Sequence, residues 1–278
     1  MDLYYDRNMN DNIIGSTIIS IENYFKKNNL PINKEWNKLN KKNNINVHWG
    51  IKCNYKPNTF FRETLIKNYK YNIIIEQGFL NRKYYRSFGI NGFAGLSNKL
   101  PQNCSDDRFK KLNINIKNMK INNNGYILIC GQLPWDTQVQ NVNYNKWLNN
   151  LFLKLKKINK KIIYRNHPLY KPRGKFKITI PNFVIIDKNK MMTDSVKNAY
   201  CCISYNSTAL IEAIIEGCPI IPYNKMSIVY NLSSKDINNL YLPTQKEIYQ
   251  TMCNISYMQY NEKEWSNGIA FNYIKTLL

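Results

Sequence analysis

The feature that most constrains this fold is the alternation of short apolar runs with helical patterns in the C-terminal half of the chain. Five runs have the length of strands buried on both faces of a sheet. They are residues 125–131, 161–165, 182–187, 200–204 and 219–222. Between the first two, residues 145–159 carry apolar side chains at spacings of three and four, as in an amphipathic helix. The alternation predicts right-handed βαβ crossovers and a parallel sheet with helices on both faces.

The most clearly bounded helix follows the fourth run. Residues 206–208, Asn-Ser-Thr, offer N-cap side chains to an apolar stretch at residues 209–216, and Gly217 stands where that helix would end. Further helices are predicted at residues 245–257 and 262–277.

The N-terminal half is less regular and reads as a second α/β domain. Residues 46–50 and 71–76 each resemble a strand that delivers polar side chains to a turn. Residues 33–46 are typical of a surface helix or loop, and residues 89–95 of a mobile glycine-rich loop.

Length and composition favour two domains. A chain of 278 residues with 44% hydrophobic residues can form two packed cores. The Asn-rich stretch 113–124 is the expected boundary. We therefore predict an N-terminal domain at residues 1–118 and a C-terminal domain at residues 119–278.

The charge of the chain is unusual. Lys and Arg number 40 against 18 Asp and Glu, a formal net charge of +22. This excess is compatible with non-specific binding to a polyanion such as nucleic acid. The excess is mostly lysine spread along a chain rich in Asn, Ile and Tyr, so compositional drift explains it equally well.

The cysteines and the apolar segments indicate the compartment. Seven cysteines without a CxxC pair favour reduced, structural thiols over a disulfide framework or a four-cysteine zinc site. The N-terminal residues do not resemble a signal peptide, and the longest apolar region, residues 200–223, is interrupted by polar residues and prolines. We expect a cytoplasmic protein with no transmembrane segment.

Polar residues follow the first predicted strand of the C-terminal domain. Gly131, Gln132 and Asp136 come just after its carboxyl end, the edge at which open α/β sheets bind ligands. For Asp136, a role in a turn is as plausible as a functional one. His167 follows the second strand and precedes a proline, which favours a ligand contact over a packing role.

The helix at residues 209–216 carries a second group of candidates. Asn206, Ser207 and Thr208 lie where a helix N-terminus would receive a phosphate, and Glu212, one turn later, is placed to accept hydrogen bonds from a ribose. On pattern alone, ordinary capping by the first three and a solvated position for Glu212 are somewhat more common.

Three residues are candidates for a general base. Glu76 closes an apolar run in the N-terminal half, where burial could raise the pKa of its carboxyl, although a turn carboxylate is the more common case. His48 lies at the end of another predicted strand and could equally be a satisfied core histidine. Asp136 is the third.

Two stretches resemble a known class of enzymes. Ser207-Thr208, Glu212-Ala213 and Gly217-Cys218-Pro219, together with Arg165-Asn166-His167-Pro168, resemble the motifs of GT-B glycosyltransferases, especially capsule-polysaccharide transferases of the Kdo-transferring kind. The resemblance covers residues 125–224. It implies two Rossmann-like domains that face each other across a cleft. It also implies that Arg165 and His167 reach the phosphates of a nucleotide, while Ser207, Thr208 and Glu212 hold phosphate and ribose.

A longer stretch resembles a group of phage and viral proteins with a GT-B-like C-terminal domain. The likeness rests on residues 127–140, on Arg165 to Pro168, and on residues 257–260 with Trp265 and Gly268. Residues 76–82 and 107–109 also find counterparts, so it extends over residues 71–278. It implies a fold more than an activity, and host cytoplasm if the protein is viral.

These observations lead to one hypothesis: a glycosyltransferase that takes a nucleotide-activated sugar in the C-terminal domain and an acceptor, such as a polysaccharide, a glycolipid or DNA, from the N-terminal domain. The predicted donor-binding residues are Gly131, Gln132, Arg165, His167, Asn206, Ser207, Thr208 and Glu212. No Walker or dinucleotide motif is present and no strong metal-ligand spacing, so we expect a metal-independent transfer without a cofactor. The alternatives are a nucleic-acid-binding protein on the same fold, a viral transferase acting on DNA bases, and a nucleotide-sugar epimerase.

Overall fold

The protein is described here by a computed structural model covering residues 1–4, 12–33, 45–50, 67–97, 99–139, 142–172 and 174–278. The chain divides into two compact units. Unit 1 comprises Met1–Asn113 and Met252–Leu278, and unit 2 comprises Ile114–Thr251. Most of the predicted surface segment at residues 33–46 lies outside the described residues.

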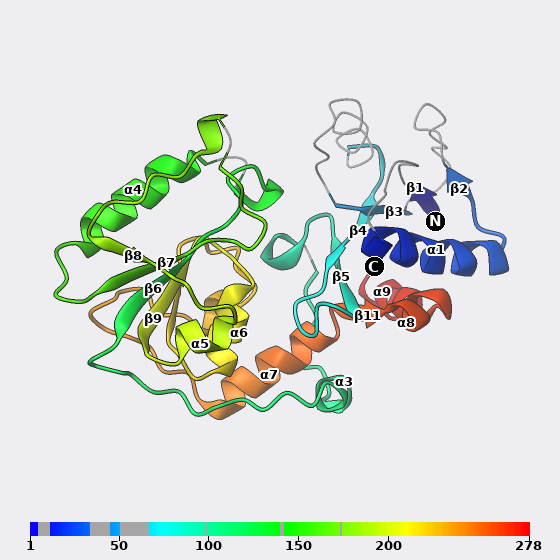
Figure 1. The fold of residues 1–278 in the computed structure, drawn as a ribbon. Helices are drawn as coiled ribbons and strands as arrows, with labels where there is room; N and C mark the ends of the chain where they lie inside the picture. Colours follow the sequence, from blue (N-terminus) through cyan, green and yellow to red (C-terminus); the bar gives the residue numbers. More distant parts are fainter. Residues whose placement is uncertain (5–11, 34–44, 51–66, 98, 140–141, 173) are drawn as a thin grey trace. The chain divides into compact units, whose positions relative to one another are not determined.

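Unit 2 is built on a five-stranded parallel sheet with the strand order β10-β9-β6-β7-β8. Its strands are β6 (Tyr126–Cys130), β7 (Ile162–Arg165), β8 (Val184–Ile186), β9 (Ala199–Ser204) and β10 (Ile220–Pro222). Figure 1 shows α4 on one face of this sheet and α5 and α6 on the other. The predicted parallel sheet with helices on both faces is therefore confirmed.

The helices of unit 2 follow from the apolar periodicity. They are α4 (Tyr144–Leu155), α5 (Met192–Val196), α6 (Ala209–Ile215) and the first part of α7 (Gln245–Ser256), whose residues from Met252 onward belong to unit 1. Unit 2 also has the short 3-10 turns η2 (Thr137–Val139), η3 (Gly174–Phe176) and η4 (Tyr230–Leu232). Asn143 caps α4 by accepting a hydrogen bond from the Lys146 amide, as N-cap chemistry requires. Leu148 and Phe152 of α4 are fully buried in one core with Ile127 and Ile129 of the sheet.

Unit 1 contains a six-stranded mixed sheet with the order β11-β5-β4-β3-β1-β2. Its strands are β1 (Asp2–Tyr4), β2 (Ile32–Asn33), β3 (Ile45–Trp49), β4 (Tyr71–Gln77), β5 (Tyr85–Ile90) and β11 (Gln259–Asn261). The first four are parallel, whereas β5 and β11 pair antiparallel. The glycine-rich stretch predicted as a loop at residues 89–95 begins within β5 and continues into the turn η1 (Ala94–Leu96).

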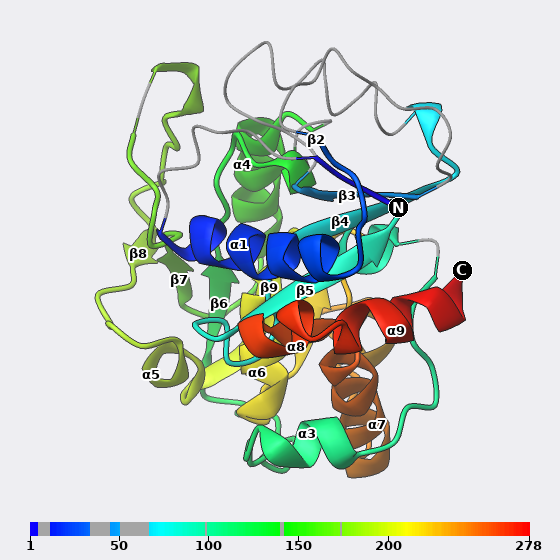
Figure 2. The ribbon, with the colours of Figure 1, turned by 90° about the vertical axis from the view of Figure 1, so that its right-hand side faces the viewer.

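Helices from both ends of the sequence build the core of unit 1. They are α1 (Asn12–Lys27), α8 (Glu262–Ser266) and α9 (Ile269–Leu277). The short helix α3 (Asp107–Lys111) follows η1 in the sequence. Figure 2 shows α1 running beside α8 and α9. Phe25 and Phe271, both fully buried, meet edge to face with ring centroids 5.6 Å apart. Such pairs stabilise a core beyond the area that they bury.

The C-terminal segment differs from the prediction in two ways. We expected residues 252–278 to belong to the C-terminal domain, but they join unit 1, because β11 pairs with β5 and Trp265 enters the same core. The helix predicted at residues 262–277 is divided into α8 and α9 at Gly268, which has a φ of +79°. A Cβ atom at Gly268 would also collide with the Tyr24 ring, so the break suits only glycine.

Among the described residues, no helix is both long enough and apolar enough to cross a bilayer.

Candidate functional site

The sheet of unit 2 has a topological switch point between β6 and β9. From β6 the chain moves outward to β7 and β8, then returns to the other side of β6 to form β9 and β10. At such a reversal, the crossover connections leave the neighbouring strand ends in opposite directions, and a crevice opens at the carboxyl ends. The ends of β6 and β9 are therefore the expected position of a ligand site in this unit.

A reciprocal hydrogen-bonded bridge joins these two strand ends. The side-chain amide of Gln132 donates to Oδ1 of Asn206 over 2.8 Å, and Oε1 of Gln132 accepts from the Asn206 amide over 2.9 Å. Ser204 donates to the carbonyl of Cys130 over 2.7 Å. Gln132 is only 6% exposed, so the bridge holds the loop after β9 firmly against the loop after β6.

Gly131 allows β6 to approach β7 closely. Its amide donates to the Arg165 carbonyl over 2.8 Å, and a Cβ atom at this position would overlap the hydroxyl of Tyr164. The next amide, that of Gln132, donates to the buried hydroxyl of Tyr144 over 2.8 Å. Burial raises the pKa of Tyr144 well above its ordinary value, so this residue stays a neutral phenol at physiological pH.

The start of α6 lies next to the bridge. Ser207 accepts a hydrogen bond from the Ala209 amide over 3.2 Å, and Thr208 is the N-cap residue. Both are half-buried, as is Asn206, whereas Glu212 is exposed in the first turn. The structure therefore brings together Gln132, Asn206, Ser207 and Thr208 at the carboxyl edge.

Arg165 is engaged in a cluster at the end of β7. Its guanidinium group bonds to the Asp187 carboxylate over 2.7 Å, to the Ser195 hydroxyl over 2.9 Å and to the Lys190 carbonyl over 2.8 Å. Burial alone would raise the pKa of Asp187, but hydrogen bonds from Ser195 and Arg165 outweigh it, and the pKa of this carboxyl lies below its ordinary value. Arg165 thus ties β7 to the loop that follows β8.

His167 and Asp136 both take part in local turns. Nδ1 of His167 accepts a hydrogen bond from the Leu169 amide over 3.1 Å, so in the neutral ring the proton is on Nε2. Oδ1 of Asp136 accepts from the Gln138 amide over 2.9 Å, at the start of η2. The turn role that the sequence left open for Asp136 is therefore present.

Trp135 lies among the aromatic residues of the same edge. Its ring stacks on Tyr170 with centroids 6.1 Å apart and meets Phe176 edge to face at 5.7 Å. These contacts anchor the loop after β6 to the loop after β7.

The other two candidate bases belong to unit 1. His48 is buried within β3, and its Nδ1 donates to the Gly50 carbonyl over 2.7 Å. Glu76 is half-buried near the carboxyl end of β4, opposite Ser87 of β5. Because β3 and β4 are parallel, both residues lie toward the same edge of the unit 1 sheet.

Sequence reasoning missed Asp187, Ser195 and Tyr144 at this edge. The position of Asp187 carries a usable signal, because it follows directly after β8 as Gln132 and Asn206 follow β6 and β9. Tyr144 carries none, because a tyrosine at the start of an amphipathic helix is ordinary. Within the described ranges, no group of three or more His, Cys, Asp or Glu side chains could hold a metal ion.

The folds of the two units, each an α/β unit with parallel strands, define the class of fold. It is a Rossmann-like, two-domain fold similar to the GT-B fold of glycosyltransferases. Neither a protein-family model nor a curated protein sequence matches the chain.

Among solved structures, the chain is similar to two transferases of KpsC from Thermosulfurimonas dismutans. With the beta Kdo 2,4 transferase it shares a TM-score of 0.60 at 10% sequence identity, over 94% of this chain and 92% of that one. With the beta Kdo 2,7 transferase the TM-score is 0.55 at 15% identity, over 99% of both chains. At these identities the likeness is one of fold.

Proposed function

We propose that this protein is a glycosyltransferase that binds a nucleotide-activated sugar at the carboxyl edge of the unit 2 sheet. The observation that carries the proposal is the switch point between β6 and β9, where Gln132 and Asn206 form a rigid polar bridge. The similarity to two Kdo transferases over nearly their whole length supports the same activity class.

The donor contacts of this proposal come from both sides of the bridge. Asn206, Ser207 and Thr208 would receive the phosphates, with hydroxyl and amide donors that suit anionic oxygen. Exposed Glu212 would accept hydrogen bonds from the ribose hydroxyls. His167 would add a donor from the β7 side through its Nε2–H group, because its Nδ1 accepts from Leu169.

Arg165 and Gly131 have supporting roles in this proposal. Arg165 sets the position of the loop after β7 through its bonds to Asp187 and Ser195, and its charge favours phosphate at the same edge. Gly131 allows the close approach of β6 to β7 on which the edge depends.

The proposed reaction needs a base and a stabilised leaving group. The acceptor hydroxyl attacks the anomeric carbon and loses its proton to the base, while the bond from that carbon to the phosphate oxygen breaks and the electron pair leaves with the nucleotide. We favour Glu76 as the base, because its side chain is half-buried and so stays within reach of an acceptor, whereas His48 is only 2% exposed and Asp136 accepts a bond in a local turn. The reaction as written uses no metal ion or cofactor.

A ligand panel tests the proposal directly. Melting temperature is measured with UDP-, CMP-, GDP- and dTDP-sugars, each beside its free sugar as a control. One donor at a hundred times its dissociation constant should stabilise the protein by about 2.7 kcal/mol. If every nucleotide sugar leaves the melting temperature unchanged, the proposal loses its main support.

A further inference from the structure

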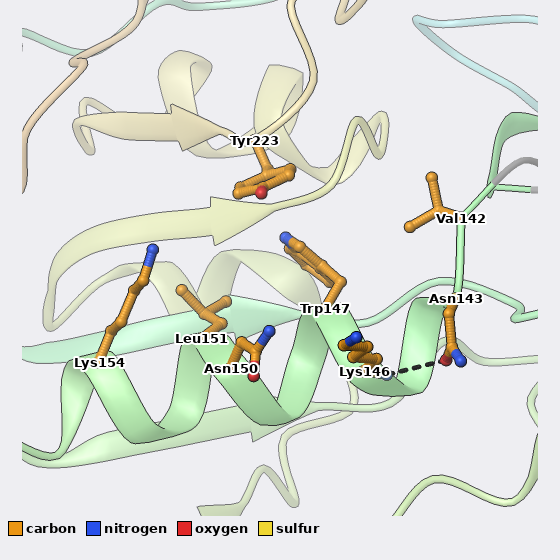
Figure 3. A pocket seen from close by; sticks show the side chains of 8 residues that line it. All are labelled: Val142, Asn143, Lys146, Trp147, Asn150, Leu151, Lys154 and Tyr223. Carbon is orange, nitrogen blue, oxygen red and sulfur yellow. Dashed lines mark hydrogen bonds between the residues drawn. The ribbon is translucent and has the colours of Figure 1, made fainter.

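A hollow of about 280 Å³ lies in unit 2 along α4, and the bridge residues Gln132 and Asn206 are not among those that line it. Figure 3 shows its floor on α4 and the ring of Tyr223, which follows β10, on the opposite side. The lining residues are Val142, Asn143, Lys146, Trp147, Asn150, Leu151, Lys154 and Tyr223. None of them belongs to the predicted donor site.

The lining is cationic and rich in hydrogen-bond donors. Lys146 and Lys154 are both exposed and stand eight residues apart on α4, a rise of about 12 Å along the helix. Across the described part of the chain, neither lysine forms an ion pair, and the lining contains no Asp or Glu. The side-chain amides of Asn143 and Asn150 add further donors. The complementary ligand is an anion with several oxygen acceptors.

Two aromatic rings in the lining favour a ligand that itself contains a ring. Tyr223 is 60% exposed, and its ring meets that of Trp147 at a centroid distance of 5.5 Å. Trp147 is only 6% exposed, and its indole nitrogen has no hydrogen-bond acceptor among the described residues. Figure 3 shows this nitrogen turned toward the Tyr223 ring, so a rotation of that exposed ring would offer the N–H to a ligand oxygen.

The size and layout favour a sugar over a nucleic-acid strand. Sites for drug-sized ligands begin at about 300 Å³, so this hollow suits one ring. Single-stranded nucleic acids are held on several successive aromatic platforms, whereas here only Tyr223 exposes its face. A sugar ring presents an apolar face for Tyr223 and hydroxyl oxygens for the amides and the indole N–H.

We propose that this hollow is a binding site for a carboxylate-bearing sugar unit of an acidic glycan. Tyr223 packs against the ring of the bound unit, while Lys146 and Lys154 pair with its carboxylate and with that of an adjacent unit of the same glycan. The choice of a glycan rests on the proposed glycosyltransferase function, and the hollow would hold a glycan substrate or product at a distance from the reacting bond. Trp147 also contacts Tyr205, the neighbour of Asn206, at 5.2 Å, so the hollow shares an aromatic wall with the switch point.

The test uses the full chain and two matched pairs of substitutions. Isothermal titration compares an oligogalacturonate with a neutral malto-oligosaccharide of the same length. In the pocket variant, Lys146→Gln and Lys154→Gln are combined. In the control variant, Lys157→Gln and Lys161→Gln remove the same charge from exposed lysines outside the hollow. A third variant, Tyr223→Leu, removes the ring face.

We expect the acidic oligosaccharide to bind, and the neutral one to bind at least about tenfold more weakly, because ionic hydrogen bonds are roughly twice as strong as neutral ones. The pocket variant and Tyr223→Leu should each lose about tenfold or more, and the control variant less than about twofold, where tenfold corresponds to about 1.4 kcal/mol. Circular dichroism should show all variants folded.

Three results would overturn the inference: no binding of the acidic oligosaccharide, equal losses in the pocket and control variants, or tighter, pocket-dependent binding of oligo-dT. The nucleotide-sugar panel is run on the same proteins. If a nucleotide sugar stabilises the protein but the acidic oligosaccharide does not bind, the glycan site is rejected and the proposed transferase function stands. If the acidic oligosaccharide binds through the hollow but no nucleotide sugar stabilises the protein, the transferase function is rejected and the glycan site stands.

Discussion

Replacing Gln132 by leucine should separate the two strand ends that meet at the switch point. The substitution keeps the volume of the side chain and removes both hydrogen bonds to Asn206. At about 1 kcal/mol for each bond, the expected loss is about 2 kcal/mol. In a unit of this size that corresponds to a fall in melting temperature of about 4–8 °C. A double-mutant cycle with Asn206→Ala isolates the energy of the bond between the two side chains, because the backbone N–H of residue 206 is kept.

Gln132→Glu is the matched variant for ligand binding. Its carboxylate still accepts from the Asn206 amide, and the Asn206 side chain can turn its NH2 group toward it, so both hydrogen bonds are kept. Because the side chain at this position is only 6% exposed, a charge there should still lower the free energy of unfolding by about 1–3 kcal/mol. The added negative charge should repel a phosphate at this edge. A repulsion of about 1.4 kcal/mol, modest for charges several ångströms apart at a partly shielded site, lowers nucleotide-sugar affinity about tenfold.

Thermal unfolding and titration with the best nucleotide sugar check both variants. A wild-type melting temperature for Gln132→Leu would refute the stabilising role of the bridge. Unchanged affinity in a Gln132→Glu variant that circular dichroism shows to be folded would place the donor elsewhere.

Three further predictions concern Glu212 and Arg165 of unit 2 and Arg108 of unit 1. Glu212→Gln should lower nucleotide affinity about tenfold and change stability by less than about 0.5 kcal/mol, because the side chain is exposed; equal affinity would remove its ribose contact. Arg165→Ala should lower the free energy of unfolding by about 3 kcal/mol and make it depend less on pH in the acid range. The lowered pKa of Asp187 stabilises the fold above its unfolded value of about 3.9, and this contribution is lost as the pH falls through the folded pKa, so denaturation at pH 3 and pH 6 checks it. Arg108→Lys should cost about 1–2 kcal/mol in urea unfolding, because the ammonium cannot reproduce the forked contact with both Glu264 oxygens; an unchanged midpoint would contradict this.

The parallel sheet of unit 2 was predictable because its strands are buried on both faces. Such strands appear in the sequence as unbroken apolar runs, as at Tyr126–Cys130, and no tertiary knowledge is needed to find them. The short strand β11 (Gln259–Asn261) has no such signal. Its pairing with β5 joins residues more than 170 positions apart, so only the tertiary structure reveals it.

The sequence predicted that the candidate residues lie at the carboxyl edge of the sheet, but not the hydrogen bonds between them. The rule that ligands gather at the carboxyl ends of strands identified Gln132, and the N-cap pattern before residues 209–216 identified Asn206. Their hydrogen bonding to each other depends on the order of β6 and β9 in the sheet, which alternation alone does not specify. The resemblance implied a phosphate contact for Arg165, and this stays a prediction. The bond of Arg165 to Asp187, 22 positions away across the β7–β8 pairing, could not be read from the sequence.

Unit 1 is built from two pieces of chain that lie far apart in the sequence. This sets the order in which the two units can finish folding during synthesis on the ribosome. Unit 2 is continuous, so all of its strands are available once residue 251 has left the exit tunnel. The core of unit 1 still lacks Trp265 and Phe271 at that moment, and its β5 edge remains unpaired. The part of the protein made first therefore matures last, and during this interval it exposes an open strand edge of the kind that chaperones protect and that promotes aggregation.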